Sequence, residues 1–393
     1  MTMRFQYTSH AQHVVFGAGE LANLGRHLGH VGGGRIILCT SGSYGRNGTV
    51  TRVQEALGER LAAVFDGVRP HVPETTVAVA VALAMEAQAQ VIIGLGGGSA
   101  LGTAKAVTAA LHDGKAVPAA LHKGTADGYG RASSRTAQPP IALVAIPTTY
   151  AGSEMTPLYG VTCSAEDRKV TTTDPRVLPA LVLYDPELTL DLPPELTAGT
   201  GVNALAHCIE GVYSTTRSPV STATALAGIE VIRRALPRCV VSGRDVEVRT
   251  QMLSGAYLAG TTIAHAALGV HHGLCHVLGG TAGVPHGVAN SIMLPHAMRF
   301  NLPACSAELS AVARALGIDT TGLTDEAAAA AAVDAVGALI HGLGMPQHLR
   351  DAGVAADDLP RLAALALKSA AVRANPHPVT TAAQVEGILQ AAW

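Results

Sequence analysis

The first half of the chain alternates short apolar runs with helical stretches, and this alternation limits the folds it can adopt. Near-continuous apolar strands separated by helices are typical of a parallel sheet, because helices cover both of its faces. We expect strands at 34–40, 61–67, 91–99, 141–149 and 180–186, and helices at 19–29, 74–88 and 99–114. The sequence therefore predicts an α/β unit with a parallel, Rossmann-like sheet.

After residue 190 the strand pattern stops and the chain becomes rich in alanine and leucine. Long helical stretches follow at 222–240, 249–268, 324–344 and 357–372. The last helix should begin at Thr381, with Gln384 three residues later completing a capping box. We therefore expect two domains, an α/β domain at 1–190 and an all-helical domain at 191–393.

The composition narrows the choice of partner and compartment. Hydrophobic residues make up 48% of the chain and charged residues 14%, with a net charge of −2 and no lysine or arginine block, which argues against nucleic acid or an anionic membrane as the partner. The six cysteines form no CxxC pair, as expected of reduced thiols. We find neither an export signal nor a membrane-spanning run, so we expect a cytoplasmic protein.

A glycine-rich turn joins the third predicted strand to the helix that follows it, in "VIIGLGGGSALGTAKA" (91–106). Gly96, Gly97 and Gly98 would let the backbone approach a ligand closely, and a helix starting near Ser99 would offer free amides to a phosphate. The alternative is an ordinary strand–helix turn. Three adjacent glycines are more than such a turn needs, so we favour phosphate binding and a dinucleotide-binding domain.

A second glycine motif, "GAGELA" (17–22), fits the dinucleotide fingerprint G-x-G-x-x-A in its letters alone. The next strand ends in Thr40 and Ser41 instead of an acidic residue, so we interpret this motif as an ordinary turn. The same absence leaves the cofactor open: no carboxylate grips a 2′-hydroxyl or repels a 2′-phosphate, so NAD(H) and NADP(H) are both acceptable.

Two hydroxyl side chains, Thr148 and Thr149, follow a predicted strand in "AIPTTYAGSEMTP" (145–157). Open α/β sheets bind ligands at the carboxyl ends of their strands, so these hydroxyls are candidates for ligand contacts. A capping turn explains this stretch equally well.

Histidines give the strongest local signal. His271, His272, His276 and His286 lie within 16 residues, and Asn203 and His207 lie one helical turn apart in "GVNALAHCIE". Such a set suits a metal ion with one exchangeable position, and imidazole suits Zn, Fe or Ni equally. A polar pocket without metal is the alternative. It is kept open by Asn203, whose amide oxygen is a weaker ligand than a carboxylate.

Together, "GLGGGSALGTAKA", "IPTTYAGSEMTP", "NALAHCIE" and "HHGLCHVLGGTAGVPHGVANSIMLPHA" resemble the iron-containing (group III) alcohol dehydrogenases, related to glycerol dehydrogenase and dehydroquinate synthase. The resemblance covers essentially the whole chain. "FDGVRPHVPE", "TTYAGSEMTPLYGVT" and "RKVTTTDPRVLP" look most like the maleylacetate reductase subgroup. The resemblance implies an NAD(P)H-dependent oxidoreductase that forms a homodimer. In such an enzyme hydride passes to or from a carbonyl or alcohol carbon of a small molecule, in the interdomain cleft.

The resemblance also implies residue roles. Gly96, Gly97, Gly98 and Ser99 match the pyrophosphate loop, Thr148 and Thr149 match cofactor contacts, and Lys169 matches a position near the ribose. Asn203, His207, His272 and His286 match the ligands of Fe²⁺ or Zn²⁺, and His276 matches a proton relay. The carbonyl oxygen would be polarised by the metal or, without metal, by His207, His272 and His286 as hydrogen-bond donors.

Several positions depart from the family pattern. Asn203 and Gly102 replace aspartates, as in maleylacetate reductases, whereas Gly273 stands where those enzymes carry a lysine. The segment "GVAN" and the loop at 121–140 look like ordinary alcohol dehydrogenases. Three other functions remain: a metal-dependent alcohol or aldehyde dehydrogenase, a lyase or cyclase of the dehydroquinate synthase type, and a binding protein with a decayed metal site.

Overall fold

The computed structural model describes residues 5–115, 117, 141–163 and 168–393, without the side chains of 168 and 169. The chain forms two compact units. One spans His10–Asp191, and the other combines the first residues with Leu192–Trp393. Within the second unit, the ring of Tyr7 packs on that of His265 with 4.6 Å between centroids. Each unit is described by itself below.

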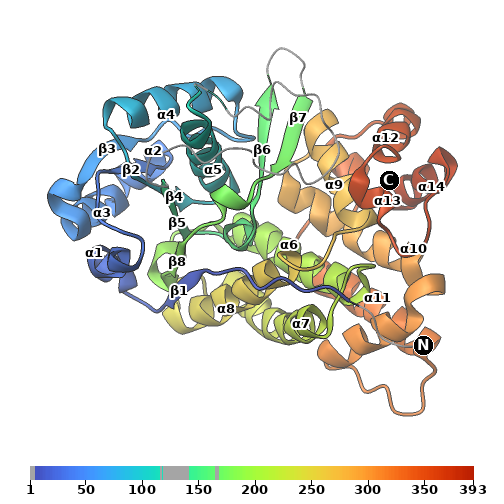
Figure 1. Ribbon diagram of the computed structural model, residues 1–393. Helices are drawn as coiled ribbons and strands as arrows, with labels where there is room; N and C mark the ends of the chain where they lie inside the picture. Colours follow the sequence, from blue (N-terminus) through green and yellow to red (C-terminus); the bar gives the residue numbers. More distant parts are fainter. Residues whose placement is uncertain (1–4, 116, 118–140, 164–167) are drawn as a thin grey trace. The chain divides into compact units, whose positions relative to one another are not determined.

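A six-stranded parallel sheet forms the centre of the first unit, in the order β1-β8-β5-β4-β2-β3 (Figure 1). The strands are β1 (His13–Phe16), β2 (Ile36–Cys39), β3 (Leu61–Phe65), β4 (Val91–Gly96), β5 (Ala142–Pro147) and β8 (Leu181–Tyr184). The five predicted strands are confirmed, each shorter than expected because its polar or glycine ends belong to turns. The edge strand β1 was not predicted, since its four residues are too few for a clear pattern.

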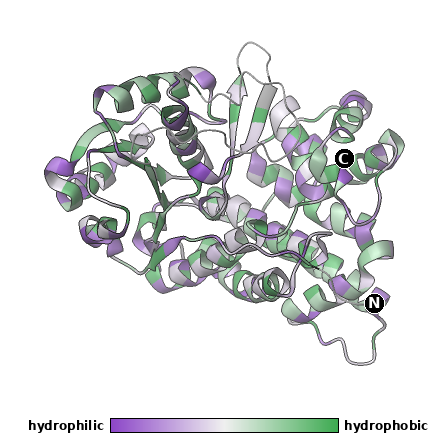
Figure 2. Ribbon diagram, viewed as in Figure 1, coloured by the Kyte–Doolittle hydropathy of each residue, from purple (hydrophilic) through white to green (hydrophobic). Residues whose placement is uncertain are grey.

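Alternation along the strands divides the core between the two faces of the sheet. In β2, Ile36 and Leu38 pack with η1 (Glu20–Asn23), α1 (Leu24–His27) and α3 (Thr49–Leu57). Ile37 and Cys39 face the other way, toward α4 (Glu74–Glu86) and α5 (Gly98–Asp113). Because both faces are covered, the strands are apolar almost throughout, and Figure 2 shows them in green.

Two parts of the first unit differ from the expectation. The predicted helix at 19–29 is divided into η1, α1 and η2 (Leu28–His30). An antiparallel hairpin, β6 (Leu158–Cys163) with β7 (Arg168–Thr173), was not predicted. The predicted loop at 121–140 lies outside the described residues. A short helix, α2 (Gly42–Arg46), follows β2.

The "GAGELA" motif forms a turn whose amides are occupied by a side chain of the same unit. The backbone N–H groups of Gly19 and Leu21 each donate to the carboxylate of Asp185 over 3.0 Å. Burial raises the pKa of Asp185, and these amide contacts lower it in part. Because these amides already donate to the carboxylate of Asp185, they are not available to a phosphate group. This supports the interpretation of the motif as an ordinary turn.

The second unit is helical. Its helices are α6 (Pro194–Tyr213), α7 (Pro219–Val241), α8 (Val246–Ile263), α9 (Val270–Thr281), α10 (His286–Ala315), α11 (Asp325–Gly342), α12 (Leu359–Ala366), α13 (Ala370–Arg373) and α14 (Ala382–Ala392). The predicted capping box of Thr381 and Gln384 at the start of α14 is confirmed. Among the described residues, we find no helix with the length and apolar character needed to cross a membrane.

Helices α6 and α10 cross where each carries a glycine. A methyl group placed on Gly287 would lie 2.8 Å from the Cα of Gly199, and one placed on Gly199 would lie 3.0 Å from the Cα of Gly287. Only glycine permits this approach, because the opposing atoms are backbone. The crossing lies one helical turn before Asn203 and next to His286, so it sets the distance between these two candidate ligands.

We predict that Gly287→Ala lowers the free energy of unfolding by about 1–3 kcal/mol, because the added methyl forces α6 and α10 apart. Gly337→Ala in α11 is the matched control, since its added methyl meets nothing within 4 Å. The control should be neutral or stabilise by about 0.5–1 kcal/mol. Urea unfolding of both variants tests this, and equal stabilities would show that the crossing tolerates a side chain.

Candidate functional site

The glycine loop lies between β4 and α5, as predicted. Gly96 ends the strand with φ of 138°, a conformation that favours glycine, and Gly97 caps α5, which starts at Gly98. Gly98 is exposed and Ser99 half-buried, so the first amides of the helix are accessible. The helix dipole and these amides can bind a phosphate group.

The two threonines lie against this loop. The N–H of Thr148 donates to the carbonyl of Gly96 over 3.1 Å, and a methyl placed on Gly97 would lie 3.0 Å from Cγ2 of Thr149. The hydroxyl of Thr148 is also 2.5 Å from the hydroxyl of Tyr44, which comes from α2. The structure thus brings Gly96–Ser99 and Thr148–Thr149 together at the carboxyl edge of the sheet.

Two other residues that the sequence analysis named in the first unit are Gly102 and Lys169. A methyl placed on Gly102 would lie 2.9 Å from Cγ2 of Val72, so this position in α5 is closed to the aspartate common in the family. Lys169 pairs with Thr162 in the β6–β7 hairpin, and its side chain lies outside the described part of the structure.

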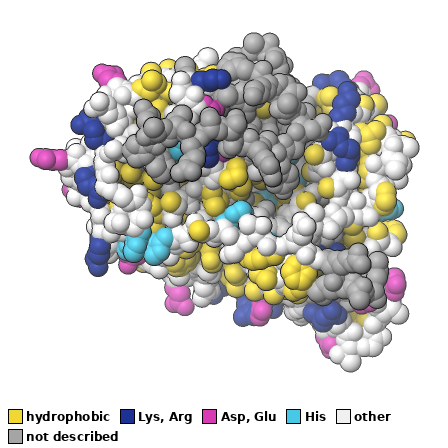
Figure 3. Space-filling view, in the orientation of Figure 1, with side chains coloured by type: hydrophobic (Ala, Val, Ile, Leu, Met, Phe, Trp, Pro, Cys, Tyr) yellow, Lys and Arg dark blue, Asp and Glu magenta, His cyan; other side chains and the backbone are white. Residues whose placement is uncertain are grey.

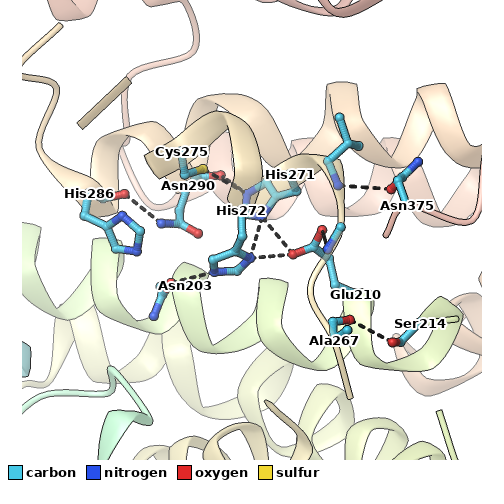
Figure 4. A network of polar contacts seen from close by, with 12 residues as sticks. Asn203, Glu210, Ser214, Ala267, His271, His272, Cys275, His286, Asn290 and Asn375 are labelled. Atoms are coloured by element: carbon cyan, nitrogen blue, oxygen red, sulfur yellow. Dashed lines mark hydrogen bonds and ion pairs between the residues drawn. The ribbon is translucent and has the colours of Figure 1, made fainter. Parts of the chain in front are cut away.

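The candidate metal ligands lie close together within the helical unit, and Figure 4 shows Asn203, His272 and His286 among them. Asn203 and His207 come from α6, His272 from α9 and His286 from the first turn of α10. The rings of His207 and His272 stack with 4.6 Å between centroids, and that of His286 lies 6.1 Å from His272. The Oδ1 of Asn203 is 3.2 Å from the Nε2 of His272.

The relay candidate, His276, lies at the same place. Its ring centroid is 6.1 Å from that of His272 and 6.0 Å from that of His286, with which it stacks at 12°. Asn203, His207, His272, His276 and His286 therefore lie in one cluster, whereas their helical spacing predicted only that Asn203 and His207, and His272 and His276, share a face.

A buried carboxylate, Glu210, holds His272 from behind. The Nδ1 of His272 donates to Oε2 of Glu210 over 2.5 Å, and the backbone N–H of Gly269 donates to Oε1 over 2.9 Å. Because the Nδ1 proton is held by the carboxylate, a neutral His272 presents a bare lone pair at Nε2, toward Asn203.

His271 shares this carboxylate. Its Nδ1 lies 3.6 Å from Oε2 of Glu210, and its Nε2 lies 3.2 Å from the carbonyl of Asn290. Burial disfavours a charge on His271, but contacts with Cys275 and Glu210 outweigh it and raise its pKa. Burial alone would also raise the pKa of Glu210, yet His272 and His271 lower it far below its usual range.

Burial disfavours a charge on two of the ligand candidates, His207 and His272. Burial lowers the pKa of His207 well below its usual value, and the imidazoles of His272 and His286 lower it further. Burial also lowers the pKa of His272, against the opposing effect of Glu210. Neutral imidazoles carry the lone pairs that a metal ion needs.

These residues fit a divalent metal ion. The buried Nδ1 of His207 has no hydrogen-bond partner among the described residues. The 3.2 Å between Oδ1 of Asn203 and Nε2 of His272 suits two ligands of one ion. Metal–nitrogen bonds of about 2.0–2.1 Å at tetrahedral angles place ligand atoms roughly 3.4 Å apart. Among the described His, Cys, Asp and Glu side chains, the donor atoms that lie within 4.8 Å of one another as a group of three are those of Glu210, His271 and His272, so a metal ion at His207, His272 and His286 would require these three imidazoles to move closer together.

Close packing explains why position 273 carries glycine. A methyl at this position would lie 2.5 Å from Cγ2 of Val372 and 3.2 Å from its backbone nitrogen, both in α13. The lysine of maleylacetate reductases has no room here.

On the face shown in Figure 3, basic and acidic side chains are scattered and of mixed sign.

Sequence reasoning missed Glu210 and Tyr44. Glu210 follows Asn203 by seven residues and His207 by three, so it lies on the same face of α6, and an acidic residue in that apolar helix was an available signal. Tyr44 gave no signal, because its contact with Thr148 joins residues 104 positions apart.

A phosphate-binding loop on a parallel sheet, together with a buried imidazole cluster on helices, defines an NAD(P)-dependent oxidoreductase. Comparison with known proteins agrees. The model of the iron-containing alcohol dehydrogenases matches residues 11–186, and that of the C-terminal part of the same family matches 197–393. The chain belongs to the iron-containing alcohol dehydrogenase family, which uses NAD(P)H and a divalent metal.

Individual relatives fall in two groups. The chain is 39% identical to maleylacetate reductase 2 of Cupriavidus pinatubonensis over 305 residues, covering 77% of this chain and 76% of the relative. The structure of maleylacetate reductase from Agrobacterium tumefaciens matches with a TM-score of 0.83 and 30% identity, covering 100% and 99% of the two chains. That of a 1,3-propanediol oxidoreductase matches with a TM-score of 0.89 and 32% identity, covering 100% of both.

We predict that Glu210→Gln lowers the free energy of unfolding by about 2–4 kcal/mol, because the amide cannot accept from both Gly269 and His272 and leaves a buried donor unmatched. Chemical denaturation measures the loss. Glu230→Gln is the control, since this exposed glutamate pairs only with Arg234 one turn away in α7. The control should change stability by less than about 0.5 kcal/mol. A similar small change in both variants would contradict the role given to Glu210.

Proposed function

We propose that this protein is a maleylacetate reductase-like enzyme that reduces the carbon–carbon double bond of maleylacetate with NADH or NADPH. The observation that carries the proposal is the cluster of His207, His272 and His286 beside Asn203. An amide at position 203 is the feature that the resemblance assigned to maleylacetate reductases, and relatives of that name support it.

We assign the cofactor to the unit His10–Asp191 and the substrate and metal to the helical unit. Gly96, Gly97, Gly98 and Ser99 would bind the pyrophosphate, and Thr148, Thr149 and Lys169 would make further cofactor contacts. At the carboxyl end of β2, Thr40 and Ser41 stand where an NAD-specific protein carries a carboxylate, and the buried hydroxyl of Thr40 donates to the carbonyl of Leu95, so NADPH meets no repulsion there.

The residues proposed to hold a divalent metal, Fe²⁺ or Zn²⁺, are Asn203, His207, His272 and His286. When bound, such an ion polarises the carbonyl oxygen as a Lewis acid. Without it, the Asn203 amide can turn its N–H toward the bare Nε2 of His272, since an amide offers either an acceptor or a donor. Asn203 therefore gives His272 a hydrogen-bond donor when no metal ion is bound, which an ionised aspartate could not do.

The chemistry follows from the substrate. Maleylacetate is a dicarboxylate in which the double bond is conjugated with a ketone. When bound, the nicotinamide would supply a hydride to one alkene carbon, and the π electrons would move toward the ketone oxygen. Imidazole N–H groups of His207 and His286 would stabilise the charge developing on that oxygen, since the N–H of His272 is held by Glu210. His276 supplies the proton that completes the other alkene carbon, and the oxidised cofactor leaves.

A second function, a metal-dependent alcohol or aldehyde dehydrogenase, is favoured by Gly273. Val372 occupies the space beside Gly273 that a lysine side chain would need. The site therefore lacks, at this position, a cation that would bind a substrate carboxylate. In this case the same cluster would act on a carbonyl or hydroxyl carbon, with hydride moving directly between that carbon and the nicotinamide.

Two further assignments go with the proposal. A homodimer is expected from the family resemblance and is tested by gel filtration. A cytoplasmic location agrees with the six described cysteines, all of which are buried and outside disulfides.

We expect rapid oxidation of NADH or NADPH when maleylacetate is added, measured as an initial rate before and after exhaustive chelation. A rate that survives chelation identifies the imidazoles as sufficient donors, and a rate that chelation abolishes identifies a metal enzyme with the same substrate. Absence of a rate with maleylacetate, together with turnover of a small aldehyde, would overturn the proposal in favour of the second function.

Asn203→Asp is the matched variant for this assay, because it adds one negative charge at nearly unchanged size. It should retain zinc or iron against chelator concentrations that strip the parent protein. Asn47→Asp controls for the substitution itself, since Asn47 is exposed and its Oδ1 only accepts from the amide of Thr49.

A further inference from the structure

A lysine in the first unit is buried, and no carboxylate of the described residues forms an ion pair with it. Lys105 lies in α5 with 1% of its surface exposed. Its Nζ donates to the backbone carbonyls of Ser153, Thr156 and Leu158 over 2.6, 2.7 and 2.8 Å. An ammonium group has three N–H donors, and each of them finds a carbonyl here.

The lysine joins the two stretches assigned to the cofactor. Its helix begins at the glycine loop, and the carbonyls that it binds belong to the segment that follows Thr149 and leads into β6. The two stretches also touch directly, through the hydrogen bond from Thr148 to Gly96. Lys105 therefore closes a second connection between them, about two helical turns from the loop.

Glu154 supplies a counter-charge at a distance. It is fully buried, and its Oε1 accepts from the hydroxyl of Tyr184 over 2.8 Å, whereas its Oε2 has no partner among the described residues. Burial lowers the pKa of Lys105 to about 7, against the opposing effect of Glu154. A buried cation is costly to hold, and a well-packed apolar residue is often as stable. Unlike an apolar residue, the ammonium group fixes the direction of three backbone carbonyl groups.

We propose that Lys105 is a positioning residue for the nicotinamide cofactor: its three carbonyl contacts hold the segment after Thr149 against α5, so that the threonines and the glycine loop keep the spacing that the cofactor needs. This inference rests on the proposed cofactor contacts at Gly96–Ser99 and Thr148–Thr149. It differs from a purely structural role in its effect on cofactor affinity.

The test compares Lys105→Met, which removes the donors at similar length, with Lys105→Arg, whose planar fork cannot serve the same three acceptors. Lys115→Met is the matched control, because Lys115 is exposed just beyond the end of α5. For each protein, the Kd of NADH and NADPH is measured by fluorescence titration, KM and kcat by initial rates, and Tm by thermal unfolding.

We expect Lys105→Met to raise the Kd and KM of the cofactor roughly tenfold or more, since a misplacement remote from the chemistry can cost up to ~100-fold. The kcat at saturating cofactor should change far less. Lys105→Arg should show a smaller increase in Kd, and Lys115→Met none. If Lys105→Met does not fold, the increase in the Kd of Lys105→Arg tests the inference in its place.

Unchanged Kd and KM in a folded Lys105→Met, or in Lys105→Arg when only that variant folds, would overturn the inference. A fall in kcat with unchanged Kd would also overturn it. Failure of the parent protein to bind either cofactor would instead refute the proposed function, and the inference with it, so the two failures are distinguishable.

Discussion

A buried carboxylate holds together the part of the helical unit on which the candidate chemistry depends. Glu210 accepts from the amide of Gly269 and from His272, and thereby fixes both the start of α9 and the tautomer of the imidazole. Asn375 completes this anchor by accepting from the amide of Val270 over 3.0 Å. The first amides of a helix otherwise lack partners, so two side chains satisfy them while orienting His272.

The anchor explains how a site with neutral ligand candidates can still attract a cation. The charge that the family places on an aspartate is absent at Asn203, but the charge of Glu210 lies behind His272 and makes that imidazole a better donor to a metal. His271 shares the same carboxylate, so the charge remains paired within the core.

The first unit relies on the same kind of device. Asp185 occupies the amides of the turn after β1, and Lys105 binds three carbonyls of the segment before β6. In both cases a buried charged side chain is matched to backbone groups that secondary structure leaves unpaired.

Much of this arrangement could be predicted from the sequence, because it follows from local pattern. Apolar runs located five strands, and helical spacing placed Asn203 with His207 and His272 with His276. Contacts between distant residues could not be predicted in this way. The role of Glu210, the contact of Tyr44 with Thr148 and the closure of Gly273 by Val372 depend on packing. The predicted helix at 19–29 is divided, because Glu20–Asn23 and Leu28–His30 adopt short 3₁₀ turns on either side of α1.

The central claim is that the chain transfers hydride from the nicotinamide to its substrate, and transfer of deuterium tests it most directly. NADH deuterated at C4, on each face in turn, would be incubated with maleylacetate and the product examined by mass spectrometry. The account predicts that one of the two labelled cofactors delivers its deuterium to the saturated product. Product without deuterium from either cofactor, or consumption of substrate with no net oxidation of NADH, would contradict it.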